Sequence, residues 1–157
     1  MYQKILVAID LSKDTDKVIK AAMALADSAA EKLHFVHVVE PISAAYSMDI
    51  YVANVSELQT EASKFASERL EALGAQWQLP SGATHSVLGT PAAEIRALAE
   101  ELGADAIVIG SHGHSGWKIL LGSTANSVLH GAHCDVCLLY TSPSPRDQRG
   151  SRMPSSA

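Results

Sequence analysis

Short apolar runs typical of buried β-strands alternate along this chain with segments whose apolar residues recur at helical spacing. The runs are KILVAID (4–10), LHFVHVV (33–39), ATHSVLG (83–89), ADAIVIG (104–110) and the segment from Asp135 onward. Helices are predicted between them at about 13–30 and 55–73, and from Thr90-Pro91 and Ser123. Because continuous apolar strands separated by helices are typical of a parallel sheet covered on both faces, we predict an α/β fold with an open five-stranded parallel sheet.

Two helix starts carry capping signals. Ser12 is a predicted N-cap, with Asp14 and Asp16 in the first turn, where carboxylates interact favourably with the helix dipole. Thr90 offers a capping hydroxyl directly before Pro91, and proline is favoured at the first helical position.

Composition limits the classes of function. The 157 residues suffice for one domain, and 47% hydrophobic with 18% charged residues is typical of an ordinary globular protein. A net charge of −5 disfavours nucleic-acid binding, and no apolar run approaches the roughly 20 residues of a membrane span. The start shows no signal peptide, and Cys134 and Cys137 are the two cysteines, so we expect a cytoplasmic protein.

The C-terminal segment differs from the rest. Residues 141–157 are rich in Ser, Pro and Arg and too polar to form a core, so we expect one domain over 1–140 and a disordered tail over 141–157. CLLYTSPSPRD (137–147) can be encoded by a transposase adapter used in preparing sequencing libraries. We therefore hypothesise that the sequence from about 137 is not native; a native disordered tail is the alternative.

The segment GSHGHSGWKILLGST (110–124) is the main candidate for a ligand-binding loop. It lies between the end of a predicted strand and the start of a predicted helix, at the edge of the sheet where α/β proteins bind ligands. Glycines let backbone N–H groups approach an anion, and a helix N-terminus favours phosphate. A surface loop with Ser123 as an ordinary helix cap is the alternative interpretation.

The glycine spacing is neither that of a P-loop nor that of the dinucleotide fingerprint. The pattern Gly110-x2-Gly113-x8-Gly122-Ser123-Thr124 resembles the ATP-binding motif of the universal stress protein family, many members of which have nine residues in the longer interval. KILVAIDLS, HFVHVVEP, GTPAAEI and LLGSTANSVLHGAHCDV also resemble that family, so that the likeness covers residues 1–136 and is nearest to the A-type, single-domain proteins.

The resemblance implies a Rossmann-like, adenine nucleotide α-hydrolase-like fold, and ATP bound with Mg²⁺. It places Asp10 at the adenosine end, the Val38 backbone at the adenine, and Ile109 and Gly110 along the nucleoside. The phosphates would be held by Gly113, Gly122, Ser123 and Thr124, with His112 beside the ligand. It also implies a stress-response regulator that acts on an unknown protein partner and forms a homodimer through the last strand.

Other site types are less well supported. His130, His133, Cys134 and Cys137 include ligands that zinc prefers, but the helix ends near Gly131 and no metal site is predicted. His34 and His37 are expected to be hydrogen-bonded structural residues. No nucleophile has a positioned base, so we expect no catalytic residues and at most slow ATP hydrolysis. The alternatives are a dimeric module without nucleotide or, with less support, a slow ATP hydrolase or an adenylate-transferring enzyme.

Overall fold

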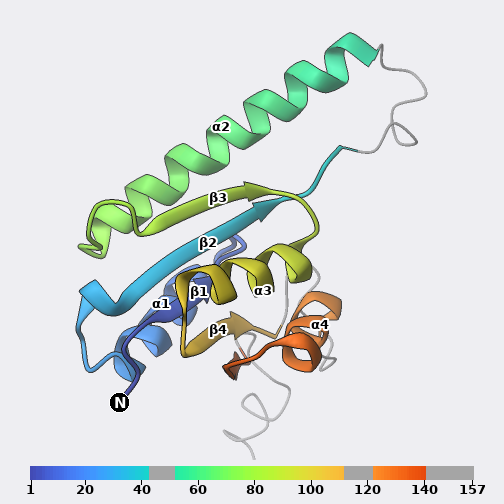
Figure 1. Ribbon diagram of the computed structural model, residues 1–157. Helices are drawn as coiled ribbons and strands as arrows, with labels where there is room; N and C mark the ends of the chain where they lie inside the picture. Colours follow the sequence, from blue (N-terminus) through green and yellow to red (C-terminus); the bar gives the residue numbers. More distant parts are fainter. Residues whose placement is uncertain (43–51, 112–121, 141–157) are drawn as a thin grey trace, which may run out of the picture.

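The computed structural model describes residues 1–42, 52–111 and 122–140 (Figure 1). The strands of this part of the chain are β1 (Ile5–Ala8), β2 (Leu33–Val39), β3 (Thr84–Leu88), β4 (Ala106–Gly110) and β5 (Asp135–Leu139). Its helices are α1 (Thr15–Leu25), α2 (Val52–Gln76), α3 (Pro91–Leu102), α4 (Ser123–Gly131) and a short 3-10 turn, η1 (Ala30–Lys32). The predicted alternation of strands and helices is confirmed.

The strands form a single parallel sheet in the order β3-β2-β1-β4-β5. The chain winds outward from β1 to β3, crosses over to β4 and then continues to β5. The direction of winding therefore reverses between β1 and β4, which lie side by side with Ala8 opposite Ile109. In open α/β sheets, ligands bind outside the carboxyl ends of the strands at such a switch point.

Helices cover both faces of the sheet, as predicted. On one face α1 packs on β1 and β4 while α2 packs on β2 and β3; on the other, α3 packs on β2, and α4 lies against α3 and β5. In Figure 1, α3 and α4 lie in front of the sheet and α1 lies behind it. Alternate residues of β1 enter the two apolar cores, with Ile5 and Val7 on the α1 side and Leu6 and Ala8 on the α3 side.

Helix α1 is shorter than the predicted 13–30. It begins at Thr15 and not at Lys13, with Asp14 at the N-cap position, so the prediction of Ser12 as the N-cap was wrong. It ends at Leu25 because Asp27 and Ser28 have left-handed φ values of 53° and 64°, which an α-helix cannot contain.

The remaining boundaries agree more closely. Strand β2 matches the predicted run over its full length, whereas β1 and β4 are two or three residues shorter than the apolar runs that contain them. Helix α3 begins at Pro91 as predicted, but Thr90 makes no side-chain capping bond, so the expected capping hydroxyl is not used. None of the helices within the described ranges is long and apolar enough to cross a membrane.

Candidate nucleotide-binding site

A pocket of about 480 Å³ opens at the carboxyl ends of β1, β2 and β4. This volume is within the range of small-molecule binding sites. Its described lining residues come from both faces of the sheet: Ala8, Ile9, Asp10, Ser12, Asp14, Thr15, Val18, Val36, His37, Val38, Val39, Glu40, Pro91, Ile95, Ile109, Gly110, Ser111, Gly122, Ser123, Thr124 and Ala125.

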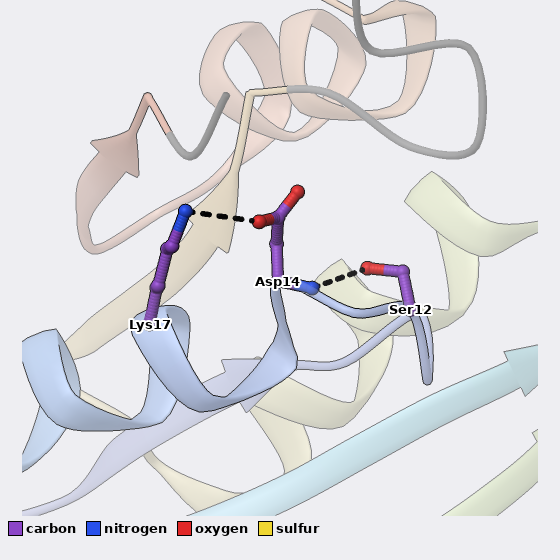
Figure 2. A network of polar contacts seen from close by, with 3 residues as sticks. All are labelled: Ser12, Asp14 and Lys17. Atoms are coloured by element: carbon purple, nitrogen blue, oxygen red, sulfur yellow. Dashed lines mark hydrogen bonds and ion pairs between the residues drawn. The ribbon is translucent and has the colours of Figure 1, made fainter. Parts of the chain in front are cut away.

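The turn after β1 forms one wall. Asp10 Oδ1 accepts a hydrogen bond from the Ser12 N–H at 3.0 Å, and Leu11 between them has a left-handed φ of 59°. Ser12 Oγ then accepts from the Asp14 N–H at 3.3 Å, and the Lys17 ammonium lies 3.3 Å from Asp14 Oδ1 (Figure 2). Ser12 thus stabilises the turn that leads into α1, which explains why the helix begins three residues after it.

The segments that follow β4 and precede α4 form the opposite wall. Ser111 donates its N–H to the Leu139 carbonyl, and its own carbonyl accepts from the Gly122 N–H, both at 2.8 Å. Gly122 is the N-cap residue of α4, and a Cβ there would lie 3.0 Å from the Ser111 carbonyl oxygen. The helix start is therefore held against the end of β4, and residues of its first turn, whose N–H groups lack partners within the helix, line the pocket.

An apolar surface lines the middle of the pocket. Val36 and Val38 of β2, Ile109 of β4 and Ile95 of α3 contribute to it. His37, also on β2, donates from Nδ1 to the Ile9 carbonyl at 2.7 Å and so connects the ends of two neighbouring strands. Apolar walls with a few polar groups are typical of small-molecule binding sites.

The structure brings together most of the predicted site residues. Those that line the pocket are Asp10, Val38, Ile109, Gly110, Gly122, Ser123 and Thr124. Predicted residues His112 and Gly113 lie outside the described residues. Thr15, His37, Glu40 and Ser111 also line the pocket but were not predicted as site residues. Their only signal in the sequence is that each lies in or just after a strand or turn at this edge of the sheet.

The charge of the described lining is negative. It includes the carboxylates of Asp10, Asp14 and Glu40 but no lysine or arginine. The Lys17 ammonium offsets the charge of Asp14, whereas Asp10 and Glu40 would repel an anion unless a cation accompanied it. The described part of the site therefore suits a polar, oxygen-rich ligand, and suits a highly charged one better when a counter-charge accompanies it.

The histidines of β2 are hydrogen bonded, and the two cysteines pack against the apolar cores. His34 Nδ1 lies 3.1 Å from His85 Nε2, so both His34 and His37 are hydrogen bonded, as predicted. Cys134 packs against the core on the α3 side of the sheet, and Cys137 packs against the core on the α1 side. The two thiols therefore lie on opposite faces of the sheet and do not form a pair of zinc ligands. Within the described ranges, no group of three or more possible metal ligands comes together.

Known proteins are similar to this chain in sequence and in fold. The sequence model of the Universal stress protein family matches residues 1–139. The chain belongs to this family. Universal stress protein A homolog 1 of Coxiella burnetii is 38% identical over 143 residues, which are 88% of this chain and 96% of the relative.

Two solved structures illustrate the shared fold. The protein MJ0577, solved as a test case of structural genomics, superposes with a TM-score of 0.77 at 27% identity, covering 92% of this chain and 99% of that protein. A universal stress protein in complex with cAMP superposes with a TM-score of 0.63 at 23% identity, covering 90% and 99% of the two chains. These likenesses show that this universal stress protein has the Rossmann-like fold of its family.

Proposed function

We propose that this universal stress protein binds ATP together with Mg²⁺, and that the bound state regulates a protein partner in a stress response. The observation that carries the proposal is the convergence of seven predicted ligand residues on one pocket at the switch point of the sheet. These residues come from four separate segments of the chain. A shared position in one cavity is what a binding role requires of them.

The apolar part of the pocket suits the adenine ring. Val36, Val38 and Ile109 provide flat apolar contact, and the backbone of β2 ends beside them. Asp10 lies at the end of β1 with one carboxylate oxygen engaged by the turn, so its second oxygen is the one proposed to accept from a ribose hydroxyl or the adenine amine. A universal stress protein of the same fold binds cAMP, which is also an adenine nucleotide.

The start of α4 suits the phosphates. Gly122 brings the backbone close without a side chain, and Ser123 and Thr124 supply hydroxyl donors in the first turn. The positive end of the helix dipole and the N–H groups of that turn favour an anion at this point.

Mg²⁺ fits the composition of the site. The described lining offers carboxylate oxygens, which are ligands that this cation prefers, and no basic side chain to offset a triphosphate. When bound, Mg²⁺ would neutralise part of the phosphate charge. The residues proposed to hold it or its water ligands are Asp14, which also pairs with Lys17, and Asp10, as the alternative to its contact with the adenosine.

We propose binding and not catalysis as the main activity. His37 is the imidazole among the described lining residues; its Nδ1 proton is donated to the Ile9 carbonyl, and no nucleophilic side chain of the described residues is hydrogen bonded to its ring. We further propose a cytoplasmic homodimer joined through β5. Cys134 is a free thiol, as a reducing compartment favours, and β5 is an edge strand of the described sheet.

Isothermal titration calorimetry tests this function. We expect ATP to bind in the presence of MgCl₂ and its affinity to fall by at least about tenfold when EDTA replaces the metal, because the carboxylates then repel the free triphosphate. Adenosine, which is uncharged, should bind equally well in both buffers.

Acid extraction of the dialysed protein followed by ion-exchange chromatography would identify a resident nucleotide. Absence of binding for ATP and adenosine alike would favour a dimeric module without a nucleotide.

A further inference from the structure

Two buried hydroxyl groups in the pocket have no hydrogen-bond partner among the described residues. They are Thr15 Oγ1 and Ser111 Oγ, and the two residues are only 7% and 1% exposed. Most buried side-chain donors in proteins are paired, because an unpaired one gives up its bonds to water without replacement. A ligand bound in the cavity that both residues line is one source of the missing partners.

The backbone groups of both residues make hydrogen bonds that do not involve the hydroxyls. Thr15 is the first residue of α1, and its N–H is donated to the Ser12 carbonyl at 3.2 Å. Ser111 uses its N–H for Leu139 and its carbonyl for Gly122. Neither hydroxyl is needed to form a turn or to cap a helix, so the hydrogen bonds that hold these segments leave both side-chain donors available.

The topology brings Thr15 and Ser111 to the same pocket. Thr15 lies five residues beyond Asp10, after β1, and Ser111 directly follows β4. Strands β1 and β4 are neighbours in the sheet, and their carboxyl ends form the switch point. Both residues line the pocket there, from the α1 side and the α4 side respectively.

We infer that Thr15 and Ser111 are ligand-binding residues whose hydroxyls donate hydrogen bonds to oxygen atoms of the bound nucleotide. This inference rests on the proposed function, and it adds two specific donors to the predicted set. The oxygens are those of the ribose or of the phosphates. Ser111 is bonded through its backbone to the N-cap of α4 and so serves the phosphate end, while Thr15 stands next to the turn of Asp10.

The test uses Thr15→Val and Ser111→Ala, which remove each hydroxyl and nearly preserve the shape of Thr15. Calorimetry with ATP and MgCl₂, and with adenosine, would be run on both variants and on the wild type. We expect the dissociation constant for ATP to rise about tenfold where the lost bond is to a phosphate, and less where it is to a ribose oxygen, because bonds to charged groups are stronger. A loss that also appears with adenosine assigns the donor to the ribose, and a loss confined to ATP assigns it to a phosphate.

The stability of the ligand-free protein separates this role from a structural one. Since neither hydroxyl has a partner among the described residues, its removal should leave the urea unfolding midpoint unchanged or slightly raised. Thr84→Val and Ser86→Ala on β3, outside the pocket lining, are the matched controls and should not change affinity. Wild-type affinity in both pocket variants, or weaker binding together with a lower midpoint, would overturn the inference while leaving ATP binding intact. A wild type that binds no ATP would overturn the proposed function as well.

Discussion

Asp10 combines a structural and a proposed ligand-binding role at the end of β1. One of its carboxylate oxygens accepts the Ser12 N–H and so stabilises the turn into α1, where Leu11 has a left-handed φ. The same side chain lines the pocket. A substitution at this position must therefore be chosen to separate loss of the turn from loss of a ligand contact.

Replacing Asp10 should weaken nucleotide binding. We expect Asp10→Ala to raise the dissociation constant of ATP by about tenfold, which is the order of one charge-assisted hydrogen bond. Asp10→Asn keeps an oxygen for the Ser12 N–H, so a similar loss in this variant would show that the carboxylate charge matters for the ligand. Calorimetry with ATP and adenosine measures both.

The matched control is Asp16→Ala, because Asp16 is a nearby exposed carboxylate on α1 that does not line the pocket. An equal loss in this control would attribute the effect to general charge, and unchanged affinity in Asp10→Ala would remove Asp10 from the site. A loss seen only when Mg²⁺ is present would assign Asp10 to the metal.

At the scale of elements, β2 and β3 are joined by a pair of histidines as well as by their backbones. The rings of His34 and His85 are stacked with centroids 5.4 Å apart and share a hydrogen bond. Burial lowers the pKa of His34, and the nearby His85 and Lys4 lower it further. Burial also lowers the pKa of His85, against a smaller opposing effect of Glu101. The fold therefore favours the neutral form of both rings.

This pair should make the protein less stable in mild acid. Because both pKa values are lower in the folded state, the unfolded chain binds more protons once the pH falls below about 6.5, the ordinary pKa of histidine. The contribution of the neutral histidine pair to the free energy of unfolding is complete above that pH. It is lost as the pH falls from there towards the folded-state pKa values. Urea unfolding at several pH values between about 5 and 8 measures the slope.

The double variant His34→Gln and His85→Gln provides the comparison, since glutamine can hydrogen bond but does not titrate. We expect its free energy of unfolding to vary less with pH over this range than that of the wild type. An identical slope in the two proteins would show that the acid sensitivity arises elsewhere.

For the whole molecule, the exposed edge at β5 is the feature that bears on assembly. Strand β5 pairs with β4 on one side and is the last strand of the described sheet. Its second half, Cys137–Leu139, belongs to the segment that we hypothesise is not native, yet it continues the strand and packs on both faces. Unpaired N–H and C=O groups along such an edge favour pairing with a second copy.

We predict that the printed sequence dimerises more weakly than a version in which residues after Val136 are replaced by a valine-rich strand. The prolines at 143 and 145 cannot donate to a sheet ladder, so the printed sequence limits how far an edge-to-edge interface can extend. Sedimentation velocity of both versions over a concentration series would give the two dimerisation constants. Equal constants would show that the sequence after Val136 does not set the interface.

The order and type of the elements could be predicted from the sequence, because apolar runs and helical spacing report directly on which residues are buried. The same local signals predicted that Ser123 begins a helix and that the glycine-rich segment lies at the ligand-binding edge. The predicted bounds of α1 were less accurate. A turn after Asp10 delays its start, and the left-handed φ values of Asp27 and Ser28 end it early. Such turns depend on backbone angles that the hydrophobic pattern does not encode.

What the sequence determined alone was therefore the set of strands and helices, the family likeness, and the segments that carry the candidate ligand residues. The tertiary structure decided which of those residues meet. The strand order places the ends of β1 and β4 side by side, so that Thr15 and Ser111, 96 positions apart in number, line one pocket. It also pairs His34 with His85 and separates Cys134 from Cys137. These outcomes depend on strand pairing and register between distant segments, which follow from packing of the whole core and not from any local pattern.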